Sequence, residues 1–176
     1  MIVVETDAGE QWQAGTDWAA LAADAVRAAV RSSRHHALID SELTVEVSVK
    51  FTDDGEVQAL NAGYRNKNRP TNVLSFPMFE ADLLAGLVRA DGGEVLLGDV
   101  VLAHGICAAE AAGKGVPVAA HAAHLVVHGT LHLLGYDHEQ DEEQAEAMEK
   151  VEREALAAIG IADPYPLADA MTEVQS

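Results

Sequence analysis

The stretch His128-Gly129-Thr130-Leu131-His132-Leu133-Leu134-Gly135-Tyr136-Asp137-His138 is the one around which the chain is organised. Its three histidines stand at relative positions i, i+4 and i+10. On a helix, residues four apart share a face, with Cβ atoms about 5–6 Å apart. The imidazoles of His128 and His132 can therefore reach one ion, because Zn–N bonds are about 2.0–2.1 Å long.

The third histidine cannot lie on the same face of a straight helix, because ten residues carry it more than two turns away. Gly135 provides a place for the helix to end, since glycine tolerates the left-handed conformation of a C-terminal turn. The chain can then return His138 to the ion. Three neutral imidazoles with a fourth position open describe a catalytic zinc site. We therefore predict one Zn²⁺ per chain, bound by His128, His132 and His138.

The spacing of these histidines equals that of the metzincin proteases, H-E-x-x-H-x-x-G-x-x-H. At the position of the general-base glutamate this chain has Gly129. Glycine cannot take a proton from water, so the ligand arrangement is protease-like but the base is missing. A metalloprotease-like hydrolase remains an alternative at this point.

The composition limits the class of protein. With 29 acidic and 11 basic residues in 176, the formal net charge is −18, which taken alone argues against nucleic-acid binding. The single Cys107 excludes an internal disulfide and a cysteine-rich zinc site. Residues 1–11 lack the basic flank of a signal peptide, and charged residues and histidines interrupt the alanine-rich stretch Val100–Val127. We expect a cytoplasmic protein with no membrane or DNA partner.

The length of 176 residues fits a single domain, which we expect over residues 1–165, followed by a frayed tail over 166–176. Alternating apolar residues from Leu43 to Phe51 indicate a strand with one buried face. The other expected elements are a helix from Asp17 or Thr16 to Arg34, a helix from Thr52–Asp54 to Tyr64, a strand over 73–76, a mobile excursion over 80–93, a buried central strand over 94–103 interrupted at Gly98 and Asp99, and helices over 106–112, from Pro117 through His132, and over 139–156. The last of these has a dense acidic face that we expect to be solvated.

Three basic residues, Arg65, Lys67 and Arg69, stand between Val57 and Phe79 with no acidic residue among them. Such a window is unusual in a chain of this charge and predicts an anion-binding patch. Arg65 is the candidate for stabilising charge on a phosphate, because its planar guanidinium matches two phosphate oxygens.

Three further residues near the histidine motif carry weaker expectations. His124 lies four residues before His128, but a fourth imidazole would close the site, so we expect His124 and His121 to support the ligands or simply to be polar. Asp137 either orients a liganding histidine through its carboxylate or accepts hydrogen bonds in the turn.

Two stretches together, Asn61–Pro77 and His128–His138, resemble the signatures of the YbeY family of bacterial metal-dependent endoribonucleases. Those signatures read N-x-x-Y-R-x-K-D-x-P-T-D/N-V-L-S-F-P and H-G-x-L-H-L-x-G-Y-D-H. The second is matched at every specified position, whereas Asn68 replaces the usual aspartate of the first. The resemblance covers roughly residues 40–156.

This resemblance implies that His128, His132 and His138 are the zinc ligands, that Arg65 is the catalytic arginine, and that His128 also serves catalysis. It implies an α+β fold in which a small mixed β-sheet is packed with helices, with the metal site at the end of a cleft of a single catalytic domain. The implied activity is cleavage of single-stranded RNA, in 3′-end maturation of 16S rRNA and in ribosome quality control. Lys67 and Arg69 would bind substrate with Arg65.

These expectations lead to the hypothesis of metal-assisted phosphodiester hydrolysis, with either a zinc-bound hydroxide or the ribose 2′-hydroxyl as nucleophile. Three basic contacts to a single strand would give a salt slope of only about −2. We therefore expect a ribosomal particle or a ribosome-associated protein to deliver the substrate. A second alternative is a non-catalytic assembly factor that uses zinc for folding alone.

Overall fold

The computed structural model describes residues 1–12, 15–65, 71–137 and 142–164. These residues form four strands and six α-helices, with short 3₁₀ helices at Glu10–Trp12 and His36–Ile39. In chain order the elements are β1 (Ile2–Ala8), α1 (Trp18–Ser32), β2 (Thr44–Thr52), α2 (Asp54–Arg65), β3 (Val73–Pro77), α3 (Ala81–Leu87), β4 (Glu94–Ala103), α4 (His104–Lys114), α5 (Val118–Leu133) and α6 (Glu142–Ala158).

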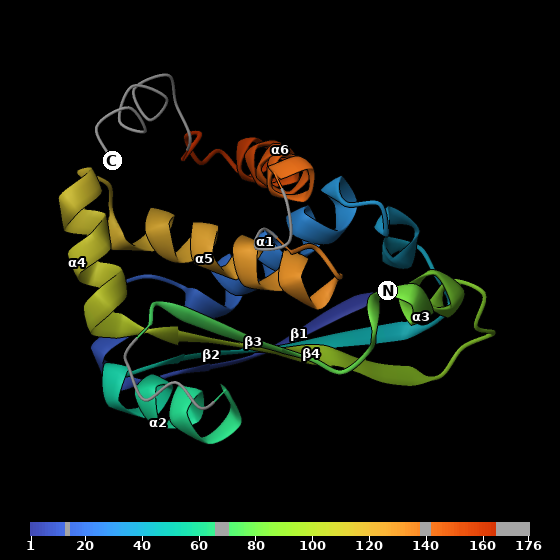
Figure 1. Cartoon of the computed structure of the whole chain (residues 1–176), viewed down its shortest axis with the longest axis horizontal. Coiled ribbons are helices and arrows are strands. Elements are labelled where there is room, and N and C mark those ends of the chain that lie inside the picture. The colour runs from blue at the N-terminus through green and yellow to red at the C-terminus, as the bar shows by residue number, and fades with distance from the viewer. Residues whose placement is uncertain (13–14, 66–70, 138–141, 165–176) are drawn as a thin grey trace.

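The sheet is small and mixed, which confirms the predicted α+β class. Its strand order is β1-β2-β4-β3. The β1–β2 and β2–β4 pairs are parallel, and the β3–β4 pair is antiparallel. Helices α1, α5 and α6 lie over one face and α2 over the other (Figure 1). The histidine-bearing helix α5 therefore rests on β3 and β4.

The alternating pattern of β2 arises from this layering. Val45, Val47, Val49 and Phe51 are all buried in the main core. The polar residues between them point to the face covered only in part by α2, where they are half-buried. The expected strand is thus confirmed to within one residue at each end, because burying one face of a strand requires this period of two.

Two of the expected helix starts have the predicted caps. Asp17 Oδ1 accepts from the backbone N–H of Ala20 at 3.0 Å at the start of α1. Asp53 Oδ1 accepts from the N–H of Glu56 at 2.7 Å at the start of α2. Such contacts satisfy backbone donors that have no partner within the first helical turn.

The expected irregularity at Gly98 is also present. The register between β2 and β4 shifts so that Val47 pairs with Gly98 while Glu46 pairs with Leu96. A Cβ at Gly98, where φ is 158°, would lie 2.5 Å from the carbonyl oxygen of Phe76. Close approach of the β3 backbone therefore requires glycine here.

Two expectations for the fold need correction. The segment 80–93 is not a structureless excursion, because it contains α3, which is anchored by the buried Leu84. The N-terminal residues were given no role, yet Ile2–Ala8 form the edge strand β1. Both segments are short, and their burial depends on partners far away in sequence. The proposed tail, 166–176, lies outside the described residues.

None of the helices in the described ranges combines the length and apolarity needed to cross a bilayer. This agrees with the interruption of the alanine-rich stretch noted above, much of which forms α4 and α5.

Cys107 is a fully buried core residue of α4. Burial, with a smaller contribution from the charge of Glu110, raises the pKa of its thiol to about 12. The reactive species is the thiolate. We therefore expect Cys107 to react with a thiol reagent at neutral pH at least about 1,000-fold more slowly in the native protein than after unfolding. Stopped-flow or absorbance measurements give the rate of thiol labelling in each state. Equal rates in the native and the unfolded protein would contradict the burial of Cys107.

Candidate functional site

His128 and His132 lie one helical turn apart near the C-terminal end of α5, and their rings face each other. The two Nε2 atoms are 3.1 Å apart, and the ring centroids are 4.6 Å apart. Two nitrogen ligands of a tetrahedral zinc ion lie about 3.3 Å apart, given the usual bond length. The separation observed here is therefore close to that of a chelating pair.

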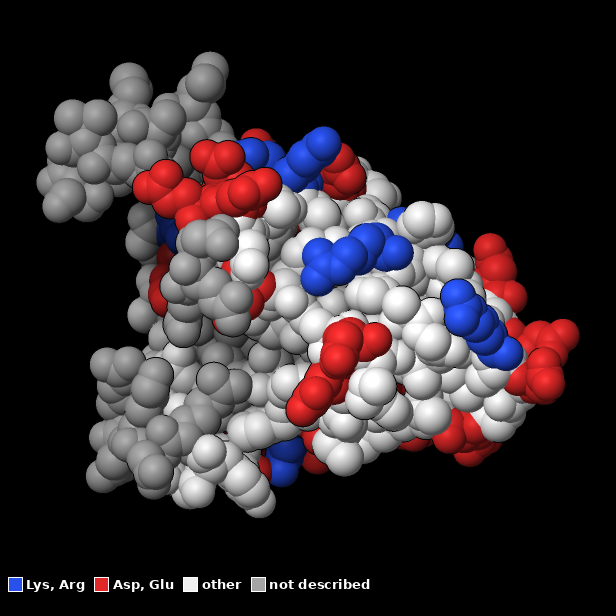
Figure 2. Space-filling view, turned by 45° about the vertical axis from the view of Figure 1, so that its right-hand side comes forward, with Lys and Arg blue, Asp and Glu red and all other residues white. Residues whose placement is uncertain are grey.

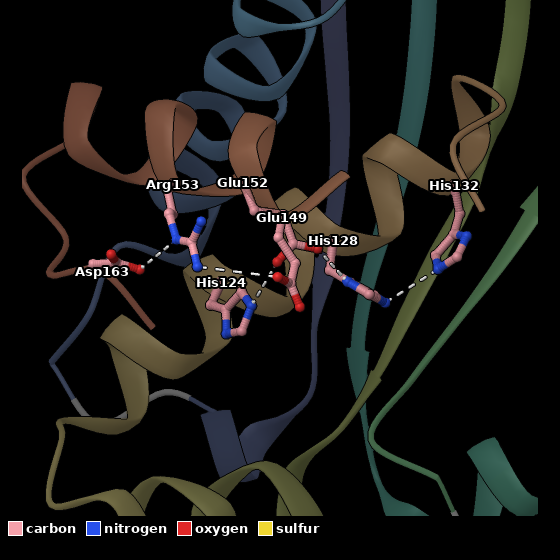
Figure 3. Close-up of polar contacts among 7 residues, drawn as sticks. All are labelled: His124, His128, His132, Glu149, Glu152, Arg153 and Asp163. Atoms are coloured by element: carbon pink, nitrogen blue, oxygen red, sulfur yellow. Dashed lines mark hydrogen bonds and ion pairs between the residues drawn. The ribbon is translucent and has the colours of Figure 1, made fainter. Parts of the chain in front are cut away.

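Each of the two rings is held through its Nδ1 atom. Figure 3 shows the contact of His128 with Glu152. His128 Nδ1 lies 2.5 Å from Glu152 Oε1, and His132 Nδ1 lies 3.0 Å from the carbonyl oxygen of Tyr136. A carbonyl oxygen and an ionised carboxylate accept hydrogen bonds and cannot donate them. The proton of each neutral imidazole therefore sits on Nδ1, and the lone pair of each Nε2 points at the other ring.

Two nitrogen lone pairs facing each other at 3.1 Å repel unless a cation or a proton lies between them. The donor set fits zinc, which binds neutral imidazole nitrogens whose other N–H is hydrogen-bonded to a carboxylate or a carbonyl. Of the metal ligands predicted from the sequence, the structure brings His128 and His132 together, and His138 lies outside the described residues. Among the described residues no group of three or more His, Cys, Asp or Glu side chains forms a metal site.

Glu152 is the functional residue that the sequence reasoning missed. It lies in α6, whose acidic residues are expected to be solvated. Its side chain is instead only 1% exposed and faces α5. That expectation is wrong for Glu152. Burial acts to raise the pKa of this carboxyl, but hydrogen bonds from His124 and His128 outweigh it and lower the pKa to about 2. The carboxylate is therefore ionised at neutral pH.

Glu152 is hard to identify from the sequence, because it is one of many glutamates in α6 and such residues usually face solvent. The signal available in the sequence is its position on the apolar stripe, four residues after Met148 and four before Leu156, both of which are buried. A carboxylate on the buried face of an amphipathic helix calls for a partner.

The described polar contacts of His124 and His121 are with carboxylates of other helices. His124 Nε2 lies 3.2 Å from Glu152 Oε2. His121 Nε2 lies 2.8 Å from Glu110 Oε1, and the same carboxylate accepts from the side-chain amide of Asn72 at the start of β3. Burial lowers the pKa of His121, although Glu110 acts in the opposite direction. Glu110 of α4 therefore contacts both α5, through His121, and the residue before β3, Asn72, which follows the basic window.

The turn after α5 has the predicted geometry. Gly135 adopts φ of 91°, and a Cβ there would lie 2.7 Å from the Cβ of Ala81 in α3. Tyr136 follows it and is buried; its hydroxyl accepts from the N–H of Arg34, whose guanidinium lies 4.1 Å from the ring centre. These contacts fix the Tyr136 carbonyl that holds His132. Asp137 is half-buried just after the turn, and neither of its two predicted roles is decided by the described contacts.

The basic window is only partly described. Arg65 is the last residue of α2, but its side chain, like Lys67 and Arg69, lies outside the described part of the structure. On the face seen in Figure 2, the visible Lys and Arg side chains are scattered singly among acidic ones. No continuous basic band is visible there among the described residues.

The fold and this site together define a class of protein: an α+β chain whose sheet supports a helix with a paired H-x-x-x-H histidine arrangement. Residues 9–160 match the family described as Endoribonuclease YbeY. The chain belongs to this family, as its resemblance in sequence indicated.

Similar proteins agree with this assignment. The chain is 59% identical to an Endoribonuclease YbeY of Rhizorhabdus wittichii, over 96% of this chain and 99% of that protein. It is 54% identical to one of Sphingopyxis alaskensis, over 94% of this chain and 98% of that protein. The solution structure of TM1509 from Thermotoga maritima shares the fold, with a TM-score of 0.53 and 24% identity over 90% of this chain and 91% of the other.

Proposed function

We propose that this chain is a zinc-dependent endoribonuclease that hydrolyses single-stranded RNA in the cytoplasm, acting in 3′-end maturation of 16S rRNA and in ribosome quality control. Membership of the YbeY family supports cleavage of RNA. The observation that carries the metal dependence is the facing pair of Nε2 atoms, 3.1 Å apart, with both Nδ1 atoms held by acceptors.

In this proposal His128, His132 and His138 hold one Zn²⁺. When bound, zinc supplies a Lewis acid that lowers the pKa of water and polarises a phosphoryl oxygen. Arg65, at the end of α2, binds the scissile phosphate and stabilises the negative charge that develops on it. Lys67 and Arg69 contact neighbouring phosphates. Gly129 offers no base beside His128, so the protein itself supplies no carboxylate at the position used by the proteases.

A proton shared between the two histidines would also relieve the facing lone pairs. Metal analysis of the purified protein separates the two explanations, because only the zinc site predicts about one equivalent of zinc, removed by a chelator together with RNA cleavage. Metal-free protein that cleaves RNA at the same rate would refute the zinc dependence.

The strongly acidic surface bears on how RNA is bound. A chain of net charge −18 repels polyanions at long range, and its basic window provides few phosphate contacts. We therefore propose that a ribosomal particle or a ribosome-associated protein presents the RNA. Tight binding of free RNA by the purified protein at high salt would argue against this part.

Replacing Arg65 by alanine should lower the rate of RNA cleavage by about 10²–10³-fold, the usual cost of removing one group that stabilises transition-state charge. The zinc content should stay unchanged, since Arg65 is not a ligand. Arg89→Ala is the matched control, because Arg89 is exposed just after α3. Wild-type cleavage by Arg65→Ala would show that Arg65 has no catalytic role.

A change in the RNA substrate, rather than in the protein, identifies the nucleophile. An RNA with a 2′-deoxy nucleotide at the scissile position removes the ribose hydroxyl and leaves the phosphate. Cleavage that survives this change identifies water as the nucleophile, and its loss identifies the 2′-hydroxyl.

A further inference from the structure

We propose that Glu152 is a positioning residue of the zinc site: reaching from α6, its carboxylate holds His128 with Nε2 directed at the metal, while His124 holds the carboxylate in place. The inference rests on the proposed zinc site and adds a residue and a helix to it. Neither the histidine motif nor the basic window includes any residue of α6.

The contacts form one chain of side chains, visible in Figure 3. His132 and His128 face each other through Nε2. His128 Nδ1 lies 2.5 Å from Glu152 Oε1, and Glu152 Oε2 lies 3.2 Å from His124 Nε2. Both carboxylate oxygens are thus used by histidines of the same helix, one turn apart. The carboxylate cannot rotate without losing one of these contacts.

The placement of Glu152 is costly unless it serves such a role. Its side chain is 1% exposed, and its helical neighbours Met148, Ala155 and Leu156 are all buried. An apolar side chain would fill the same space without the cost of removing a charge from water. A buried carboxylate that contacts a ligand histidine opposite its metal-binding nitrogen is, by contrast, the arrangement that fixes ring orientation and tautomer in metal sites.

Glutamine at this position separates packing from positioning. It has nearly the same shape, but one of its two terminal atoms donates hydrogen bonds and cannot accept them. If the amide nitrogen faces His128 Nδ1, the ring must move its proton to Nε2, the atom that binds metal. If it faces His124 Nε2, the amide oxygen still accepts from His128 Nδ1, but as a neutral acceptor it binds the ring more weakly than the carboxylate does. Either way His128 is held less firmly for the metal.

The experiment compares the wild type with Glu152→Gln and two control variants. Glu149→Gln removes a carboxylate from the same helix, where its partly exposed side chain approaches Arg153. Glu110→Gln removes a carboxylate that also contacts a histidine of α5, His121, which is not a proposed ligand. Zinc affinity is measured by chelator competition. The tautomer of His128 is read from nitrogen-15 NMR of the zinc-free protein at about pH 8.5, above the ordinary pKa of histidine.

Glu152→Gln should weaken zinc binding by about 10–100-fold, and both control variants should bind as the wild type does. In the zinc-free wild type His128 should carry its proton on Nδ1, and in Glu152→Gln the Nε2-protonated form should appear. Equal zinc affinity and an unchanged tautomer in Glu152→Gln would overturn the inference. If Glu152→Gln does not fold, the nitrogen-15 spectrum of the zinc-free wild type tests the inference. A proton on Nε2 of His128 in that spectrum would overturn the inference.

Zinc binding by the wild type distinguishes failure of the proposed zinc site from failure of the proposed role of Glu152. A wild-type protein that binds no zinc would refute the metal site, and the role of Glu152 with it. Zinc bound with equal affinity by the wild type and by a folded Glu152→Gln would refute only the role of Glu152.

Discussion

Replacing His132 by alanine is expected to abolish stoichiometric zinc binding and to reduce RNA cleavage by more than about 1,000-fold. The change removes one of the two Nε2 atoms that face each other at 3.1 Å. Loss of a residue behind a ligand already costs about 10–100-fold in metal affinity or activity, and loss of the ligand itself removes the activation of water that the metal supplies. Zinc content and the rate of cleavage of a single-stranded RNA measure the effect.

The same variant tests whether zinc serves only to fold the protein. The hydrogen bond from His132 to the carbonyl of Tyr136 is worth about 1 kcal/mol to the fold. The main core, which runs from β1 to α6, does not depend on it. We therefore expect His132→Ala to keep its circular dichroism spectrum and a cooperative unfolding transition. An unfolded variant would favour the non-catalytic assembly factor that uses zinc for folding alone.

The matched control is His36→Ala, in the short 3₁₀ helix His36–Ile39. His36 is exposed, so its removal should change neither zinc content nor cleavage. Equal losses in the two variants would mean that the effect is not specific to the pair on α5.

Replacing Gly129 by glutamate should destabilise the protein by at least about 3 kcal/mol rather than create a protease. A Cβ on Gly129 would lie 2.7 Å from Cγ1 and 3.2 Å from Cγ2 of Val100 in the centre of β4. Overfilling a packed core costs about 1–3 kcal/mol, and a buried unpaired carboxylate adds to this. Denaturant unfolding of the zinc-free protein measures the loss.

Gly113→Glu is the control for this change. Gly113 also lies within a helix, α4, but a Cβ there meets no other atom within 4 Å. Exchanging glycine for a better helix former at an open position should be neutral or stabilise by up to about 1 kcal/mol. A folded Gly129→Glu that cleaves peptides would instead support the metalloprotease alternative, because it would show that the new carboxylate reaches the metal rather than β4.

Gly129 thus has a different meaning in the structure than in the sequence. Compared with the metzincin pattern, it appears as a missing general base. In the fold it lies where α5 packs directly against β4, and a side chain there would point at Val100. Glycine itself cannot act as a general base, and the contact with Val100 leaves no room for a carboxylate at this position. Only the second reason depends on tertiary packing.

The sequence by itself determined the features that depend on residues close together in the chain. The period of two in β2, the caps at Asp17 and Asp53, and the turn at Gly135 follow from local backbone and side-chain geometry. The facing of His128 and His132 follows from the helical repeat. Their sequence context was specific enough to indicate the family.

The tertiary structure alone decided which further segments join the core and which partners the buried groups meet. Residues Ile2–Ala8 become a strand because β2 offers them an edge, and Ala81–Leu87 become a helix that packs at the Gly135 turn. Glu152 approaches His128 from 24 residues away in the sequence. Its position on the apolar stripe of α6 indicates burial, but nothing local identifies the groups that it meets there. The free energy of a carboxylate depends on whether its surroundings are water or paired donors. That environment exists only once α6 has packed on α5.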